Sequence, residues 1–299
     1  YRDKIFDIDY NDTKSNNLIS LDIKINKTCN LSCRICGPAF SSKWASEVSQ
    51  NKKSYPKFAS LPLLKNEWTD VNGSKVWKDL EEITSDLSYL TFSGGEPLLD
   101  KTHSSMLQYF INKQRSSYIS LHYNTNATIF ASNLIPLWSR FKEVELSFSI
   151  DNTGKKFEYE RYGVSWKTIV DTIEKYKKVT DTVLNLNVWS TITTLNILDT
   201  YTLFQFCREH GLPISFNLLN DPKQLNICLF NKKQKKYITD KLLNIQDNEF
   251  QKIIEPIMAW MNNSNMSTDT ANMIDFLSVT DKIRKQDYKQ TYEELTYIL

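Results

Sequence analysis

The stretch KTCNLSCRICGP, residues 27–38, places three of the five cysteines of the chain within eight positions. Three residues separate Cys29 from Cys33, and two more separate Cys33 from Cys36. Thiolates are ligands for zinc, copper(I) and iron–sulfur clusters. A closed zinc site or a standard [4Fe–4S] site takes four protein ligands, whereas three leave one iron open. The spacing therefore indicates a catalytic cluster. Three incidental buried cysteines, or a zinc or iron–sulfur binding module without turnover, are the alternatives.

A repeating strand–helix pattern surrounds this stretch. Short segments in which polar and apolar residues alternate predict strands at 19–26, 88–93, 118–124, 143–150, 183–192 and 214–219. Helical patterns fall at 38–50, 73–86, 102–115, 131–140, 165–179 and 198–210. Six alternating units predict an α/β fold with a parallel sheet, a partial (β/α)6 TIM-like barrel. A doubly wound open sheet is the alternative.

The pattern also divides the chain into regions. We expect residues 1–18 to form an N-terminal segment and residues 19–220 to form the partial barrel, with 51–72 as an insertion or lid. Residues 221–299 read as a C-terminal helical extension. Its helices are predicted at 232–246, 248–263, 270–285 and 288–298.

Polar and apolar residues alternate along the predicted strands, so each strand has one apolar and one polar face. The apolar face should pack under the helices, and the polar face should then line a water-accessible substrate chamber. An antiparallel sheet with one solvated face would show the same alternation. The substrate candidates on the polar face are Asp22, Lys24, His122, Glu145, Asn187 and Asn217. An internal salt-bridge network of Lys24 with Asp22 and Glu145, and a core role for His122, are the structural alternatives.

Composition excludes several functional classes. The chain has 37 Lys and Arg against 35 Asp and Glu, so its net charge of +2 predicts neither nucleic-acid nor membrane-surface binding. No apolar stretch reaches the length of a membrane span, and no signal-peptide pattern is present. An odd, clustered set of cysteines suits a reducing compartment, so we expect the protein to be cytoplasmic.

A second motif gives the cysteine stretch a specific meaning. The segment TFSGGEPLL, residues 91–99, places Gly94, Gly95, Glu96 and Pro97 at the end of the second predicted strand. Cysteines spaced as Cys-x3-Cys-x2-Cys after the first strand, followed by GGEP after the second, resemble the radical S-adenosylmethionine (radical SAM) superfamily. Glycines at this turn let the backbone approach a ligand closely.

Further segments resemble the branch of the superfamily that contains the SPASM and twitch subfamilies. NTNAT at 124–128 and SFSIDNTG at 147–154 match segments that contact the cofactor, as do FEYERYGVSWKTIV and WSTITTLN further along. The resemblance implies cofactor contacts from Ile35, Asn126, Ser149, Asp151, Arg161 and Thr193, besides the GGEP residues. Turn roles for Ser149 and Asn126, and a surface ion pair for Arg161, are the structural alternatives.

The resemblance implies one [4Fe–4S] cluster, held by the three clustered cysteines, and S-adenosylmethionine bound at its open iron. It also implies reductive cleavage to a 5′-deoxyadenosyl radical that abstracts hydrogen from a peptide, a protein side chain or a small polar metabolite. Flavodoxin or ferredoxin would donate the electron. Only Cys207 and Cys228 remain for an auxiliary cluster, so we predict none, and we predict that Cys207 is a buried core thiol. No catalytic side chain, substrate or oligomeric state is assigned.

Overall fold

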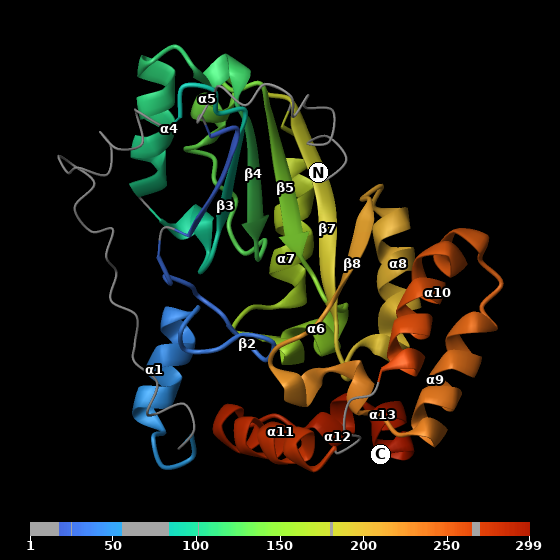
Figure 1. The fold of residues 1–299 in the computed structure, drawn as a ribbon. Coiled ribbons are helices and arrows are strands. Elements are labelled where there is room, and N and C mark those ends of the chain that lie inside the picture. The colour runs from blue at the N-terminus through green and yellow to red at the C-terminus, as the bar shows by residue number, and fades with distance from the viewer. Residues whose placement is uncertain (1–17, 25, 56–83, 101, 180–181, 265–269) are drawn as a thin grey trace.

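The fold is drawn in Figure 1 from a computed structural model, which describes residues 18–24, 26–55, 84–100, 102–179, 182–264 and 270–299. Three predictions fall wholly or largely outside the described residues. They are the helix at 73–86, of which only 84–86 are described, residues 56–72 of the insertion, and the N-terminal segment except for residue 18.

A six-stranded parallel sheet forms the centre of the molecule. Its strands follow the order of the chain, β1-β3-β4-β5-β7-β8, and every neighbouring pair is parallel. The strands are Ser20–Lys24, Tyr89–Ser93, Ser120–Thr125, Glu143–Ser149, Leu184–Ile192 and Ile214–Leu218. A doubly wound sheet would reverse its order at a switch point. The sequential order therefore confirms the α/β prediction of an open, partial barrel, and parallel pairing excludes the antiparallel alternative.

Helices pack on the apolar face of this sheet. They are α4 (Thr102–Asn112), α5 (Ile135–Trp138), α7 (Trp166–Tyr176) and α8 (Thr200–Glu209). A core of buried residues joins them to the strands: Phe92 and Leu146 of the sheet belong to the same cluster as Phe110, Trp138 and Ile173 of the helices. The helix predicted at 131–140 is shorter in the structure: it begins at Ile135, with Pro136 in its first turn, and ends at Trp138.

The sequence predictions do not include two short strands and one helix. The two-residue strands β2 (Ser32–Cys33) and β6 (Arg161–Tyr162) form an antiparallel ribbon, and α6 (Gly154–Glu160) leads directly into β6. Helix α1 (Ser42–Gln50) begins four residues later than predicted, because the Ser41 side chain accepts a hydrogen bond from the Trp44 amide and caps it. Short 3-10 helices span Pro97–Leu99, Ser116–Tyr118, Ile197–Asp199, Lys223–Leu225 and Ile227–Leu229.

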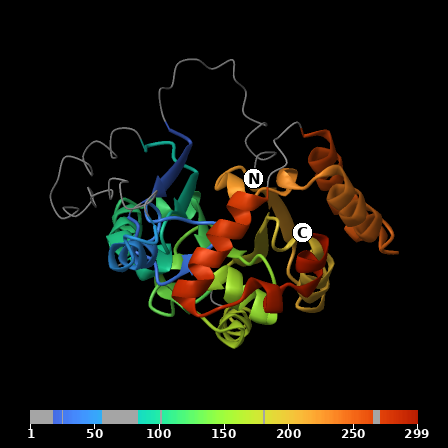
Figure 2. The same cartoon turned by 90° about the horizontal axis from the view of Figure 1, so that it is seen from below.

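The C-terminal residues form helices, as predicted. They are α9 (Lys232–Leu243), α10 (Asn248–Asn263), α11 (Ala271–Arg284), α12 (Tyr288–Thr291) and α13 (Glu293–Ile298). The break at Tyr292 divides the helix predicted at 288–298 into two. These helices bury a second apolar cluster that includes Trp44 of α1 and Ile192 of β7. Helix α11 lies beyond the carboxyl ends of the strands and crosses that end of the molecule (Figures 1 and 2). In the described part of the chain, no helix is both long and apolar enough to cross a membrane.

Candidate metal and cofactor site

The cysteine loop, residues 27–38, follows β1 at the carboxyl edge of the sheet. Helix α1 fixes the start of this loop through Ser42. The Ser42 hydroxyl accepts from the Cys29 amide at 3.0 Å and donates to the Cys29 carbonyl at 3.1 Å. The Trp44 indole donates to the Cys33 carbonyl at 2.7 Å. The first turn of α1 therefore holds the cysteine loop in place through hydrogen bonds to Cys29 and Cys33.

The three cysteines of this loop are close enough to influence one another. Cys33 is buried, and Cys29 and Cys36 are partly exposed. Burial raises the pKa of the Cys33 thiol to about 12, and the neighbouring cysteines add to the rise. Burial likewise raises the pKa of Cys36 to about 11, with a contribution from Cys29. Thiolates here therefore need a positive charge beside them, which a metal centre supplies.

The thiols are not already drawn together as ligands. Among the described residues no group of three or more His, Cys, Asp or Glu side chains is arranged to hold a metal ion. The Cys36 thiol instead lies 3.8 Å from the carbonyl of Gly37. The donor type and number fit a cluster with three protein thiolates, and binding it requires the side chains to turn from these positions.

The β2–β6 ribbon brings Arg161 to this loop, 128 residues away in the sequence. Arg161 lies opposite Cys33 in the ribbon, and one guanidinium nitrogen is 3.9 Å from the Cys33 sulfur. Its other nitrogens donate to Asp151 at 2.9 and 2.7 Å. Burial opposes the charged form of Arg161, but Asp151, Cys33 and Glu160 together favour it, so the pKa of Arg161 is raised. Asp151 also accepts from the Thr191 amide at 2.8 Å. A buried cation is thus fixed beside the cysteines.

The Gly94–Gly95 turn packs directly against the cysteine loop. Both glycines have positive φ, +77° and +56°. A Cβ on Gly95 would lie 2.5 Å from the Thr28 carbonyl oxygen, a distance that real side chains essentially never show. The next amide, that of Glu96, donates to the same Thr28 carbonyl at 2.7 Å. The second glycine of GGEP is therefore required for close approach of two backbones.

The Glu96 carboxylate is engaged by groups of the chain itself. It accepts from the Leu98 amide at 3.1 Å, from the Thr125 hydroxyl at 2.8 Å and from the Asn126 amide at 2.6 Å. Burial raises its pKa to about 7, and these hydrogen bonds oppose the rise. Glu96 thereby joins the ends of β3 and β4, and Pro97 begins the 3-10 turn that follows.

Asn126 connects the end of β4 to the cysteine loop. Its side-chain nitrogen Nδ2 donates to the side-chain oxygen of Asn30 at 3.0 Å and lies 3.8 Å from the Cys29 sulfur. Its oxygen accepts from the Thr128 amide at 3.0 Å. The structure therefore brings Asn126, from the end of β4, and Arg161, from β6, to the cysteine loop.

The remaining cofactor candidates lie around the same edge. Ser149 ends β5 and is partly exposed. Thr193 is buried just after β7, where its hydroxyl accepts from the Leu195 amide at 3.1 Å. Ile35 packs partly buried against the second apolar cluster. The cofactor role of each of these residues stays a prediction.

The substrate candidates occupy the polar face of the sheet. Asp22, His122 and Glu145 lie in one row across the sheet. Asp22 of β1 pairs with Thr91 of β3, which pairs with His122 of β4, and His122 in turn pairs with Glu145 of β5. Asp22 accepts from the Ser93 hydroxyl at 2.6 Å, and His122 contacts the Ser147 hydroxyl at 2.8 Å.

The other candidates of this face lie further along the strands. Asn187 donates to Glu145 at 2.7 Å, whereas Lys24 and Asn217 are exposed. Within the described residues Lys24 forms no ion pair with Asp22 or Glu145, so the salt-bridge alternative is not observed there. A substrate role for this face stays a prediction.

Sequence reasoning missed the residues that hold the cysteine loop from the C-terminal helices. Arg34, between Cys33 and Cys36, is fully buried and stacks 3.5 Å above the Tyr159 ring. It forms an ion pair with Asp281 of α11 and donates to the Tyr159 carbonyl at 2.7 Å.

A second buried ion pair lies on the same helix. Arg284, less than one turn after Asp281, pairs with Glu47 of α1 at 3.1 Å and stacks over the Trp44 ring at 4.8 Å. The C-terminal extension therefore holds both the cysteine loop and the helix after it. No spacing or motif in the sequence indicates such long-range pairs.

Comparison with solved structures agrees with the observed architecture. Native anSMEcpe with bound AdoMet matches 84% of this chain at 20% identity with a TM-score of 0.53, and the match covers 63% of that chain. Native anSMEcpe with bound AdoMet and Cp18Cys peptide matches 75% at 19% identity with a TM-score of 0.51, over 58% of that chain. This chain thus spans less than two thirds of the anSMEcpe length.

At this identity the likeness establishes the fold. The partial-barrel fold expected from the sequence is therefore confirmed, and it is shared with structures that contain bound AdoMet. The likeness does not distinguish the SPASM and twitch branches. No description of a known protein family matches the sequence, and no curated protein does.

Proposed function

We propose that the chain is a radical SAM enzyme that uses one [4Fe–4S] cluster and S-adenosylmethionine to modify a peptide or protein side chain. One observation carries the proposal. In a fold shared with AdoMet-bound anSMEcpe, three thiols of one loop lie at the carboxyl edge of the sheet beside the buried Arg161. A zinc site closed by four protein ligands lacks a fourth candidate in that loop.

In this proposal the three cysteines, Arg161 and Glu96 have different roles. Cys29, Cys33 and Cys36 would hold the cluster, which when bound supplies the electron that cleaves S-adenosylmethionine to a 5′-deoxyadenosyl radical. Arg161, next to Cys33, offers a buried positive charge that can offset thiolates or attract a carboxylate. Glu96 keeps the GGEP turn against the cysteine loop, and the close backbone packing there helps to exclude water.

The peptide substrate is supported by one comparison. The structure of anSMEcpe with bound AdoMet and Cp18Cys peptide shares the fold over 75% of this chain. A small polar metabolite is the other substrate class that the polar strand face would suit. The electron donor in the proposal is a flavodoxin or ferredoxin, and the compartment is the reducing cytoplasm, where clustered thiols persist.

Anaerobic reconstitution with iron and sulfide tests the proposal. We expect about four irons per chain and release of 5′-deoxyadenosine when dithionite and S-adenosylmethionine are added. Cys33→Ala should abolish both the bound iron and the cleavage. Cys207→Ala is the control, since Cys207 is fully buried in α8 within the sheet–helix core and should leave cleavage intact. Stoichiometric zinc, with no cleavage product, would instead identify a non-catalytic metal-binding module.

A further inference from the structure

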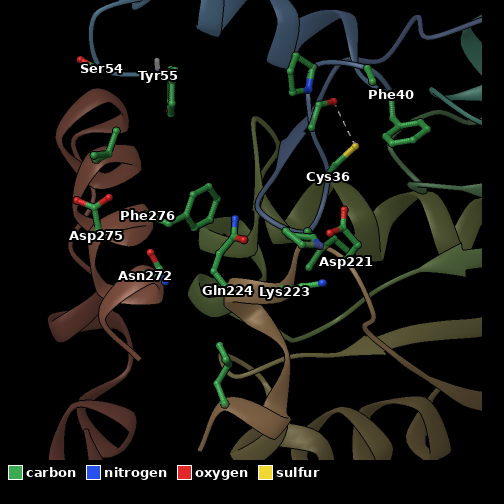
Figure 3. Close-up of a pocket in the computed structure, with 17 residues that line it drawn as sticks. Cys36, Phe40, Ser54, Tyr55, Asp221, Lys223, Gln224, Asn272, Asp275 and Phe276 are labelled. Atoms are coloured by element: carbon green, nitrogen blue, oxygen red, sulfur yellow. Dashed lines mark hydrogen bonds between the residues drawn. The ribbon is translucent and has the colours of Figure 1, made fainter. Parts of the chain in front are cut away.

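A cavity of about 610 Å³ opens on the outer side of the cysteine loop. Its walls come mainly from the loop at 35–40, the turn at 221–224 after β8, and α11, with Ser54, Tyr55 and Leu229 completing the lining. β1 and β8 are the two edge strands of the sheet, and the segments that follow them line the same cavity. The sheet therefore curves enough to bring its two edges toward each other at this end. Figure 3 shows Phe276 and Gln224 directed into the space between α11 and the loop.

This cavity is separate from most of the cofactor candidates. Of those residues within the described part of the chain, only Ile35 lines it, together with the cluster ligand candidate Cys36. The GGEP turn, Asn126 and Arg161 contact the cysteine loop from the sheet side instead. An occupant of the cavity would therefore touch Ile35 and Cys36 of the cysteine loop and leave the GGEP turn, Asn126 and Arg161 free for S-adenosylmethionine.

The lining is mainly apolar. Phe40, which is 54% exposed, forms part of one wall, and Phe276 and Val279 of α11 form part of another. Aromatic and aliphatic walls of this kind bury an apolar side chain, and the volume lies in the range of ordinary ligand sites.

Acidic residues outnumber basic residues in the described lining of the cavity. Asp275 on α11 and Asp221 after β8 lie on opposite walls, and Lys223 is the one basic residue of the lining (Figure 3). Both aspartates are exposed, and within the described residues neither has a hydrogen-bond or ion-pair partner. Two unpaired carboxylates around an apolar pocket attract a cation that carries an apolar body.

We propose that this cavity binds a peptide substrate through an aromatic or long aliphatic residue next to a lysine or arginine. The proposal rests on the proposed function for the identity of the ligand as a peptide, and it adds where the peptide docks and which residues it must carry. The N-terminal part of α11 is then a specificity element, and its C-terminal part holds the cysteine loop through Asp281 and helix α1 through Arg284.

Photo-crosslinking to the reconstituted protein without reductant tests the docking site. The probe is an acetylated pentapeptide in which p-benzoylphenylalanine precedes lysine, and mass spectrometry locates the label. We expect labels within 35–40, 54–55, 221–224 or 272–279, or at Leu229, unchanged when S-adenosylmethionine is added. Labels elsewhere, or loss of labelling with S-adenosylmethionine, would overturn the proposal.

Competition with unlabelled peptides tests the charge preference. A Phe-Lys pentapeptide should compete at a concentration about tenfold lower than its Phe-Glu counterpart. Asp221→Asn and Asp275→Asn should each weaken the Phe-Lys competitor about fivefold, the factor for one charge pair near the surface. Asp240→Asn, which removes an exposed carboxylate of α9 paired with Lys236, is the matched control and should change nothing. Equal competition by both peptides would contradict the inference.

Failure of this inference is distinguishable from failure of the proposed function. Release of 5′-deoxyadenosine by the unaltered protein, measured with dithionite and without peptide, depends on the cluster and not on the cavity. Cleavage together with labels outside the cavity would leave the enzyme assignment intact and refute the docking site. Cavity labelling with no cleavage would refute the radical chemistry and leave a peptide-binding site.

Discussion

The buried ion pair between Arg34 and Asp281 provides a direct test of how the C-terminal helices support the cysteine loop. Asp281 accepts from Arg34, from the Tyr159 hydroxyl at 2.7 Å and from the Tyr288 amide at 2.7 Å. Asp281→Asn leaves the Arg34 guanidinium buried without its counter-charge. It can also set an amide nitrogen against the Tyr288 N–H, so that two donors face each other. Breaking a buried pair in this way costs about 3–5 kcal/mol of the free energy of unfolding, a large fraction of the roughly 5–15 kcal/mol of a typical domain.

Urea unfolding followed by far-ultraviolet circular dichroism measures this cost. Asp171→Asn is the matched control, because Asp171 pairs with Lys167 on the exposed face of α7 and should cost less than about 1 kcal/mol. Arg34→Met combined with Asp281→Asn should be less destabilised than the sum of the two single variants by about 1–3 kcal/mol. A cost for Asp281→Asn as small as that of Asp171→Asn, or additive single variants, would refute the reasoning.

Two further perturbations test the site. Gly95→Ala should lower the free energy of unfolding by roughly 2–5 kcal/mol, because the added Cβ meets the Thr28 carbonyl and is strained at φ +56°. The same variant should lower the iron bound per chain. In the control Gly211→Ala, φ is +66° and nothing lies within 4 Å of the added Cβ, so the loss should be only about 1–2 kcal/mol. Equal losses in urea unfolding would show that the Thr28 contact is unimportant. Burial and the nearby Asp151 raise the pKa of Glu160 from 4.5 to about 8. Between these two pH values Glu160 therefore keeps its proton in the folded state and loses it in the unfolded state. The free energy of unfolding should fall as pH rises from about 4.5 to 8, and Glu160→Gln should flatten that slope in thermal melts at pH 5.5 and 8.5; an unchanged slope would contradict the assignment.

The sequence was sufficient to predict the sheet and the principal motifs. Alternation of polar and apolar residues in six separated runs reflects the pleat directly, and the parallel sheet follows from the helices between them. The prediction that Cys207 is a core thiol is confirmed, since it is fully buried among apolar residues of α8. These properties are local or periodic, so a single sequence records them.

The contacts that join distant parts of the chain could not be predicted. The β2–β6 ribbon has two residues in each strand, too few to show a period, yet it sets Arg161 beside Cys33. Arg34 reads as an ordinary surface residue of a polar loop, because nothing near it in the sequence indicates that Asp281 will cover it. The cavity likewise depends on how α11 crosses the end of the sheet.

The distance in sequence between Arg34 and its partners has a consequence for the order of events during synthesis. The ion pair with Asp281 spans 247 residues, and the hydrogen bond to Gln286 spans 252. At roughly 5–20 residues per second, a ribosome needs on the order of 10–50 s to make this interval. For that time the three cysteines have left the ribosome while the groups that enclose their loop do not yet exist. The loop is therefore among the first parts of the protein to be made and among the last to be completed, and we expect iron delivery to follow release of the chain.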